Sequence, residues 1–159
     1  MPRASVKKTV SARKAALVFG TFCAVVILGV SAYVSVSKAP RSELRTQFIT
    51  FGGKRFQVAV ADTNKARAKG LGDYESLAND EGMLFVFERP GKHCFWMKDV
   101  EFPIGIFWLD EERRVVKSID SLSPDTYPEL FCPEEPVNYV LEIAGGQAQN
   151  LQKPLKLEL

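Results

Sequence analysis

Histidine is almost missing from this chain, whose 159 residues include only His93. A Ser-His-Asp or Cys-His catalytic set would have to be built on that one imidazole. A glycine-rich phosphate loop ahead of a helix is also lacking, since GGQAQN (145–150) does not match its spacing. These absences argue against the common nucleophilic and nucleotide-binding sites. A pair of carboxylates stays open as catalytic machinery, because their spacing in space is not visible in a sequence.

Acidic residues are absent from residues 1–39, which hold six Lys or Arg. The rest of the chain carries 15 of the 21 basic residues against all 19 acidic ones, a net charge of about −4. Phosphate binding needs a cationic face. We therefore expect no nucleic acid partner for this mildly acidic part.

Charge of either sign is missing from the 22 residues between Ala15 and Val36. As a helix this run would be ~33 Å long, enough to cross a ~30 Å hydrocarbon core. A cleaved signal peptide is the alternative, but its apolar region should be only ~7–15 residues long. Pro40 also sits awkwardly after Ala39, the one small-residue cleavage site available. The run therefore predicts an uncleaved single span, with the membrane as a partner.

Five basic residues precede this run and predict that the N-terminus stays cytoplasmic. The expected organisation is a basic cytoplasmic tail (1–14), a transmembrane helix (15–36), a polar linker (37–45) and an extracytoplasmic β domain (46–159). The chain would then be a single-pass protein of the cell membrane.

Cysteine is scarce, with three residues in the chain. Cys23 lies in the predicted span, whereas Cys94 and Cys132 lie in the predicted outer domain, where disulfides persist. A Cys94–Cys132 disulfide is the first interpretation. Two free thiols, or a metal site that also uses His93, are the alternatives, although three ligands with two adjacent suit tetrahedral geometry poorly. We expect no bound metal and no cofactor.

Most of residues 46–159 alternate with a period of two. TQFITF (46–51), a Gly52-Gly53 turn and the Phe56, Val58, Val60 alternation predict a hairpin. GMLFVF (82–87) and IGIFWL (104–109) are apolar on both faces, which predicts central strands covered on both sides. Further candidate strands are RRVVKSI (113–119), NYVLEI (138–143) and the alternation of Leu155, Leu157 and Leu159.

Helical signals are few. Asp62 or Thr63 can cap a short helix that ends at Gly70, and a second short turn is expected at 145–150. About seven strands with one or two short helices predict a mainly β fold, an antiparallel sandwich or barrel. Without a clear βαβ alternation, no parallel sheet is expected.

Four segments, taken in order, resemble the domain-of-unknown-function family 192. They are ADTNKARAKGLG (61–72), SLANDEGMLFVF (76–87), FWMKDVEFPIGIFWLD (95–110) and YVLEIAGG (139–146). The resemblance covers roughly residues 46–159 and implies a compact fold like a jelly-roll sandwich. It implies no established activity. The chain departs from the family pattern at Gly72 and Tyr74, where the family reads GLM with an Arg soon after, and at Asp99, where Asn is commoner.

HCFWMKDV (93–100) is predicted to be a core strand, with Trp96 and Lys98 on one face and Asp99 on the other. Trp96 and Lys98 could stack a ring-shaped ligand and pair an anionic group. In the commoner alternative, Trp96 fills the core and Lys98 snorkels to a nearby carboxylate. Arg67 could bind a carboxylate or phosphate, or tie the helix to Asp110 or Glu142, which is again the commoner outcome.

Three function classes follow. The first is a non-catalytic, membrane-anchored domain that binds a small molecule, a glycan or an envelope protein through Arg67, Trp96, Lys98 and Asp99. The second is an envelope hydrolase that uses Asp99, Asp110 or Glu142 with Lys98; no catalytic residue is assigned. The third is a purely structural module. Asp110 is expected in a turn and Glu142 on a solvent-facing strand position.

Overall fold

The computed structural model describes residues 44–159. The predicted tail (1–14), membrane span (15–36) and linker (37–45), except for its last two residues, lie outside this range. Within residues 44–159, no helix is long and apolar enough to cross a membrane.

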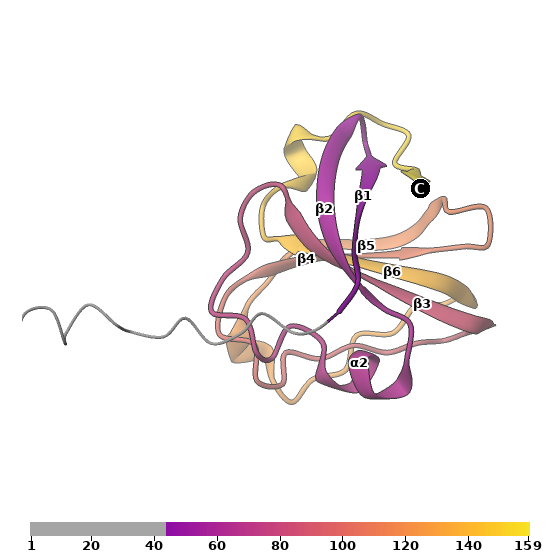
Figure 1. Cartoon of the computed structure of the whole chain (residues 1–159). Coiled ribbons are helices and arrows are strands. Elements are labelled where there is room, and N and C mark those ends of the chain that lie inside the picture. Colours follow the sequence, from indigo (N-terminus) through magenta and orange to yellow (C-terminus); the bar gives the residue numbers. More distant parts are fainter. Residues whose placement is uncertain (1–43) are drawn as a thin grey trace, which may run out of the picture. The chain divides into compact units, whose positions relative to one another are not determined.

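Seven strands form one curled sheet in the order β5-β4-β6-β3-β2-β1-β7 (Figure 1). Their bounds are β1 Thr46–Phe51, β2 Lys54–Ala61, β3 Glu81–Gly91, β4 Ile104–Leu109, β5 Val115–Leu122, β6 Val137–Ala144 and β7 Leu157–Glu158. The two edge strands, β5 and β7, meet where each begins. The amide of Val115 donates a hydrogen bond to the carbonyl of Leu155 (3.3 Å), and the amide of Leu157 donates one to the carbonyl of Arg113 (3.0 Å). The sheet is therefore a half-barrel whose outer strands touch at one end. A two-sheet sandwich is not formed.

The predicted hairpin is confirmed. β1 pairs antiparallel with β2, and Phe51 lies opposite Lys54. Gly52 and Gly53 between them have φ angles of 56° and 75°. This left-handed region favours glycine, and two such residues make the tight turn that suits twisted strands.

One strand pairing contradicts the expected all-antiparallel arrangement. β2 and β3 run parallel, with Val58 opposite Gly82 and Val60 opposite Leu84, whereas the other pairings are antiparallel. Residues 62–80 make the crossover between them and include helix α2 (Asn64–Lys69). A parallel connection needs about a dozen residues or more. The sequence hid this βαβ unit because a six-residue helix gives too short a periodic pattern to recognise.

The predicted helix has the expected ends. The Thr63 side chain accepts a 3.2 Å hydrogen bond from the amide of Ala66, and Gly70 ends the helix with a φ of 53°. Ala66 is the buried residue of α2 and turns this helix toward the sheet. The second short turn is also present, as the 3-10 helix η2 (Ala148–Asn150).

Apolar side chains cover both faces of the sheet. On the concave face, Phe51 of β1 and Phe107 of β4 are 4.9 Å apart although three strands separate β1 from β4 in the sheet. Only the curl can bring them together. The other cluster includes Phe85, Met97 and Trp108 and packs with Ala66 of α2. The helix and the long loops gather on one side of the sheet in Figure 1. They cover this second cluster and create the surroundings of the candidate site.

The segment HCFWMKDV is not the core strand that its composition predicts. Phe95 makes a single antiparallel bridge with Phe131, and Lys98 and Asp99 form a turn. Asp99 has a φ of 59°, which an extended strand does not allow. The alternation survives locally, because Met97 is buried whereas Trp96 is 44% exposed. Trp96 therefore does not fill the core.

Candidate functional site

A pocket of about 670 Å³ lies between the end of α2, strand β3 and the segment that follows β3. Its wall contains Arg67 to Leu71 from the helix end, Phe85 and Phe87 from β3, and Leu130. The following segment contributes Lys92 to Trp96 and Lys98 to Val100, and β6 contributes Glu142. Three of the predicted ligand contacts come from one short segment, and the fourth, Arg67, comes from the facing helix. The volume is within the range of small-molecule sites, roughly 300–1,000 Å³.

Glu142 is the buried charged residue in the wall of this pocket. Its strand position is opposite Met83 on β3 and Ile106 on β4, and its side chain is 4% exposed. Burial among apolar neighbours raises the pKa of its carboxyl to about 8, since the charged form loses its hydration. The expected solvent-facing position is therefore wrong. β6 is covered on both faces, by the concave core on one side and by the helix and loops on the other.

Nothing in residues 44–159 donates a hydrogen bond or pairs a charge with the Glu142 carboxyl. Within the same residues, no side-chain polar atom is both sealed from solvent and without a partner. The carboxyl oxygens must therefore reach the open space of the pocket. A buried carboxyl that meets no protein donor is costly and needs an explanation.

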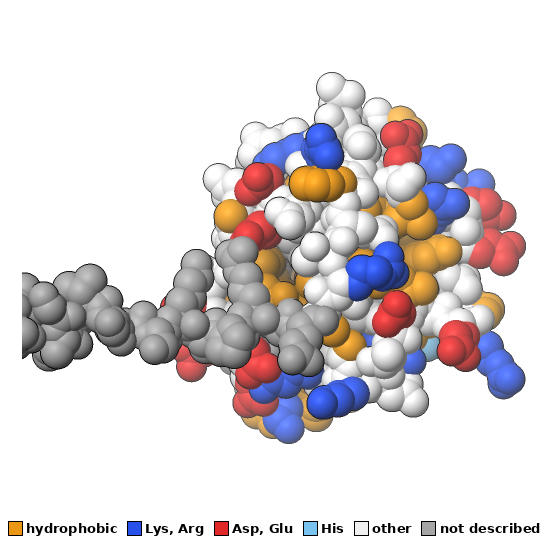
Figure 2. All heavy atoms as spheres, in the orientation of Figure 1, with side chains coloured by type: hydrophobic (Ala, Val, Ile, Leu, Met, Phe, Trp, Pro, Cys, Tyr) orange, Lys and Arg blue, Asp and Glu red, His pale blue; other side chains and the backbone are white. Residues whose placement is uncertain are grey.

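Basic side chains stand at the mouth of the pocket. Lys92 and Lys98 are exposed and have no ion pair among the residues described, whereas Lys69 pairs with Asp73 at 2.6 Å. The Lys98 ammonium lies 5.8 Å from the ring centre of Trp96, so the two share a face as predicted. The exposed Asp99 adds one negative charge at the mouth. Away from the pocket, charges of both signs are interspersed on the face shown in Figure 2.

Arg67 holds helix α2 against the neighbouring strands. Its guanidinium donates to the carbonyls of Asp62 (2.8 Å) and Val86 (2.7 Å) and to the side chain of Asn64 (2.6 Å). These bonds join α2 to the end of β2 and to β3. The expected ties to Asp110 and Glu142 are absent from this set. Asp110 lies outside the pocket and forms the predicted turn, because its carboxylate accepts hydrogen bonds from Arg114 (2.8 and 2.9 Å).

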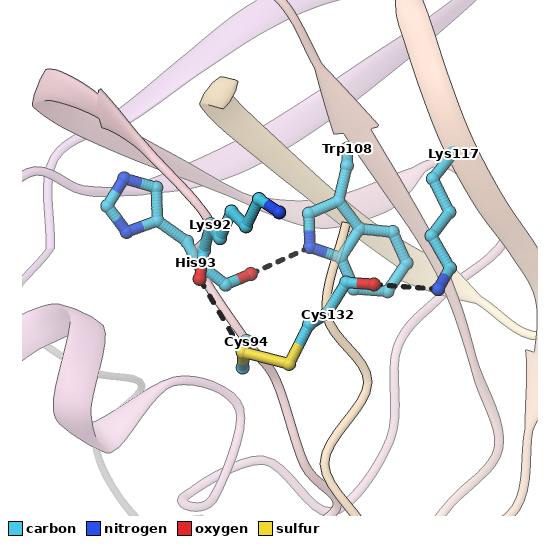
Figure 3. The surroundings of a disulfide bond; sticks show 6 residues. All are labelled: Lys92, His93, Cys94, Trp108, Lys117 and Cys132. Carbon is cyan, nitrogen blue, oxygen red and sulfur yellow. Dashed lines mark hydrogen bonds between the residues drawn. A yellow bond between two sulfur atoms is a disulfide. The ribbon is translucent and has the colours of Figure 1, made fainter. Parts of the chain in front are cut away.

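The Cys94–Cys132 disulfide is confirmed, with a sequence separation of 38 residues. This decides against free thiols and against a metal site at these cysteines. Figure 3 shows the disulfide and the hydrogen bonds around it. Trp108 Nε1 donates to the carbonyl of His93 (2.9 Å), and Lys117 Nζ donates to that of Cys132 (2.7 Å). The disulfide and these two hydrogen bonds thus fix one wall of the pocket to the sheet.

His93 lies in the same wall, stacked on Phe87 with ring centres 3.5 Å apart. Burial lowers the pKa of its imidazole, and the nearby Arg67 charge acts in the same direction. Its Nε2 is 3.3 Å from the carbonyl of Arg89 and so carries the proton, which leaves Nδ1 as an acceptor. No group of three or more His, Cys, Asp or Glu side chains in residues 44–159 could hold a metal ion.

The four predicted ligand contacts all line the pocket, whereas the buried Glu142 in the same wall was expected to face solvent. The aromatic wall formed by Phe85 and Phe87 was assigned to a central strand without a pocket beside it. Glu142 carried a usable signal, because Val140, Leu141 and Ile143 around it are apolar at both alternations of the strand. A charged residue within such a run is expected to be buried, and a buried carboxyl is a site candidate.

Residues 44–159 therefore form a half-barrel β domain, a curled mixed sheet with a pocket beside a short helix and a disulfide-bonded loop. The chain belongs to the family DUF192, described as "Uncharacterized ACR", whose model matches residues 47–154.

Two solved structures share the fold. A protein of unknown function from Novosphingobium aromaticivorans DSM 12444 has a TM-score of 0.69 and 30% identity, over 76% of this chain and 89% of that one. A "putative transcription regulator" from Sinorhizobium meliloti 1021 has a TM-score of 0.68 and 22% identity, over 74% and 96% of the two chains. No curated protein matches the chain.

Proposed function

We propose that this chain is a membrane-anchored, non-catalytic binding domain that takes a small molecule with an anionic group into the pocket above Glu142. The observation that carries the proposal is the Glu142 carboxyl, which lines the 670 Å³ pocket, is 4% exposed and has no partner among residues 44–159. A fold gains nothing from an unsatisfied buried carboxyl, so a bound molecule that partners it is its simplest purpose.

The charges at the mouth support the anionic group. Lys92 and Lys98 are exposed basic residues without ion pairs among residues 44–159, on a domain whose net charge is negative. Trp96 beside Lys98 offers an exposed ring face for the rest of the molecule. Arg67 is a lesser candidate, because three hydrogen bonds already occupy its guanidinium.

The cellular location is part of the same proposal. The uncharged run at residues 15–36 and the basic residues before it support a single span with the domain outside the cytoplasm. The Cys94–Cys132 disulfide supports an oxidising compartment. Protease added to intact cells should digest the domain, and full protection of the domain would contradict the location.

Binding is tested by saturation-transfer NMR of the full chain against a panel of small carboxylates, phosphate esters and acidic sugars. We expect at least one compound to bind the wild type and to lose binding in Lys98→Glu, because the variant reverses a charge at the mouth. Lys65→Glu is the matched control, since Lys65 is exposed on α2 but does not line the pocket. Absence of binding throughout the panel, or equal losses in both variants, would contradict the proposal.

A hydrolase is the second candidate, favoured by one specific observation. A carboxyl with a pKa of about 8 keeps its proton at neutral pH, as a general acid must. Chromogenic esters, phosphate esters and glycosides test this function. Turnover by the wild type that is lost in Glu142→Gln would establish it and displace the non-catalytic proposal.

A further inference from the structure

The wall of the proposed pocket carries an acidic group at a buried position and basic groups at exposed positions. We infer that the ligand is a zwitterion, with an ammonium group at Glu142 and an acidic group at Lys92 and Lys98. This inference rests on the proposed function and specifies its ligand class. It follows from where the charged side chains lie: the buried part of the pocket wall holds the Glu142 carboxyl, and the exposed part holds Lys92 and Lys98, which have no ion pair among residues 44–159.

The buried end suits an ammonium group because of what surrounds Glu142. Phe85 is its diagonal neighbour on β3, on the same face of the sheet, and Phe95 packs edge-to-face on Phe85 with ring centres 4.8 Å apart. Both rings line the pocket. A ligand ammonium would supply the charge and the donors that the carboxyl lacks, and aromatic rings favour a cation beside them.

The exposed end suits the ligand's acidic group. Lys98 is positioned by Trp96, 5.8 Å away, and Lys92 belongs to the stapled wall next to Cys94. A purely anionic ligand would satisfy these lysines but would leave Glu142 without a donor. A purely cationic ligand would have to pass them. A molecule with both charges matches both ends.

Few other groups can confuse a titration of this site. The charged and titratable residues that line the pocket with Glu142 come from α2 and from the segment after β3, and they are Arg67, Lys69, Lys92, His93, Lys98 and Asp99. The strand neighbours of Glu142, Met83 and Ile106, carry no charge. Burial lowers the pKa of His93 and raises that of Glu142, so their transitions lie apart.

Three probes of nearly equal shape test the inference on the full chain by isothermal titration calorimetry. L-phenylalanine carries both charges, 3-phenylpropanoate lacks the ammonium group, and 2-phenylethylamine lacks the carboxylate. A second series with a small body uses γ-aminobutyrate, butyrate and butylamine. In at least one series we expect the zwitterion to bind about tenfold or more tighter than both single-charge probes.

Glu142→Gln should abolish this preference, because it keeps the shape and removes the charge. Glu101→Gln, at an exposed position outside the pocket, is the matched control and should keep it. The pH profile of the wild type is an independent readout that needs no variant. An ammonium ligand requires ionised Glu142, so the affinity should rise about tenfold per pH unit from pH 6 toward 8.

The outcomes separate the two proposals. If the anion-only probe binds as tightly as the zwitterion and loses binding in Lys98→Glu, the zwitterion is wrong and the anion-binding function stands. If affinity falls as the pH rises toward and above 8, Glu142 acts as a neutral donor and the zwitterion is again wrong. If no probe in either series binds, the zwitterion is contradicted. If none of the carboxylates, phosphate esters and acidic sugars binds either, the proposed function is contradicted as well.

Discussion

The indole nitrogen of Trp108, on β4, donates a 2.9 Å hydrogen bond to the backbone carbonyl of His93, in the loop that walls the pocket. Trp108 is fully buried, so this bond lies in a medium where it is strong. Together with the adjacent Cys94–Cys132 bond, it sets the position of the loop before any ligand arrives (Figure 3). A preformed wall lowers the entropy that binding would otherwise cost.

Glu142 should make the domain less stable as the pH rises from about 4.5 to 8. In this window the unfolded chain has released the proton while the folded chain keeps it, because the folded pKa is about 8 against an ordinary 4.5. Each pH unit should therefore cost about 1.4 kcal/mol of unfolding free energy. Urea denaturation of the wild type and Glu142→Gln at pH 5, 7 and 9 checks this. The unfolding free energy of the variant, relative to that of the wild type, should rise up to about pH 8 and stay constant above it. A difference that is the same at all three pH values would contradict the buried carboxyl.

Loss of the disulfide should weaken the fold. A closed loop of 38 residues stabilises by roughly 4 kcal/mol in the chain-entropy model. Cys94→Ser with Cys132→Ser should lower the unfolding free energy by up to that amount in urea titrations, whereas Cys23→Ser should not. In denaturant without reductant, the wild-type chain should show one free thiol. Three titratable thiols would refute the bond.

Arg67 and Lys98 should differ in what their removal does. Arg67→Ala deletes three hydrogen bonds, two that join α2 to its neighbours and one to Asn64 within α2, each with a net value of about 1 kcal/mol, so the melting temperature should fall by roughly 10 °C. Lys98→Ala deletes an exposed side chain and should change the melting temperature little. Thermal scans of both variants decide this. If Lys98→Ala alone destabilises and no ligand screen changes, the purely structural function is favoured.

Asp99 should be replaceable by residues that accept a left-handed backbone. Its φ of 59° suits Gly, Asn and Asp, and costs other residues about 1 kcal/mol or more. Asp99→Gly and Asp99→Asn should therefore keep the wild-type stability, whereas Asp99→Ala should lose about 1 kcal/mol and Asp99→Val more. Denaturation curves of the four variants check the order.

Local signals in the sequence predicted most secondary elements. The two glycines between alternating segments located the β1–β2 hairpin, and Thr63 and Gly70 bounded α2, because each of these features depends on neighbouring residues alone. The pairing of Cys94 with Cys132 was the first of three interpretations, based on the oxidising compartment that the sequence predicts for both. The membrane span at residues 15–36 stays a prediction, because it lies outside the described residues.

The parallel β2–β3 pair and the site needed the whole fold. An alternating pattern tells which side chains share a face, but it does not tell what covers that face. The commoner of the two alternatives for Trp96, a side chain that fills the core, is therefore wrong, because Trp96 is 44% exposed. Glu142 was expected to face solvent, although it is 4% exposed.

The amino-acid sequence by itself determined that the domain is mainly β and where its hairpin and short helix lie, and it favoured a bond between Cys94 and Cys132. Only the tertiary structure decided that α2 and the disulfide-bonded loop cover the outer face of the sheet. There the Glu142 carboxyl has no partner among residues 44–159 and lines the same pocket as Lys92 and Lys98. The physical reason is that burial and charge separation depend on segments distant in sequence, whereas turns and caps depend on adjacent residues.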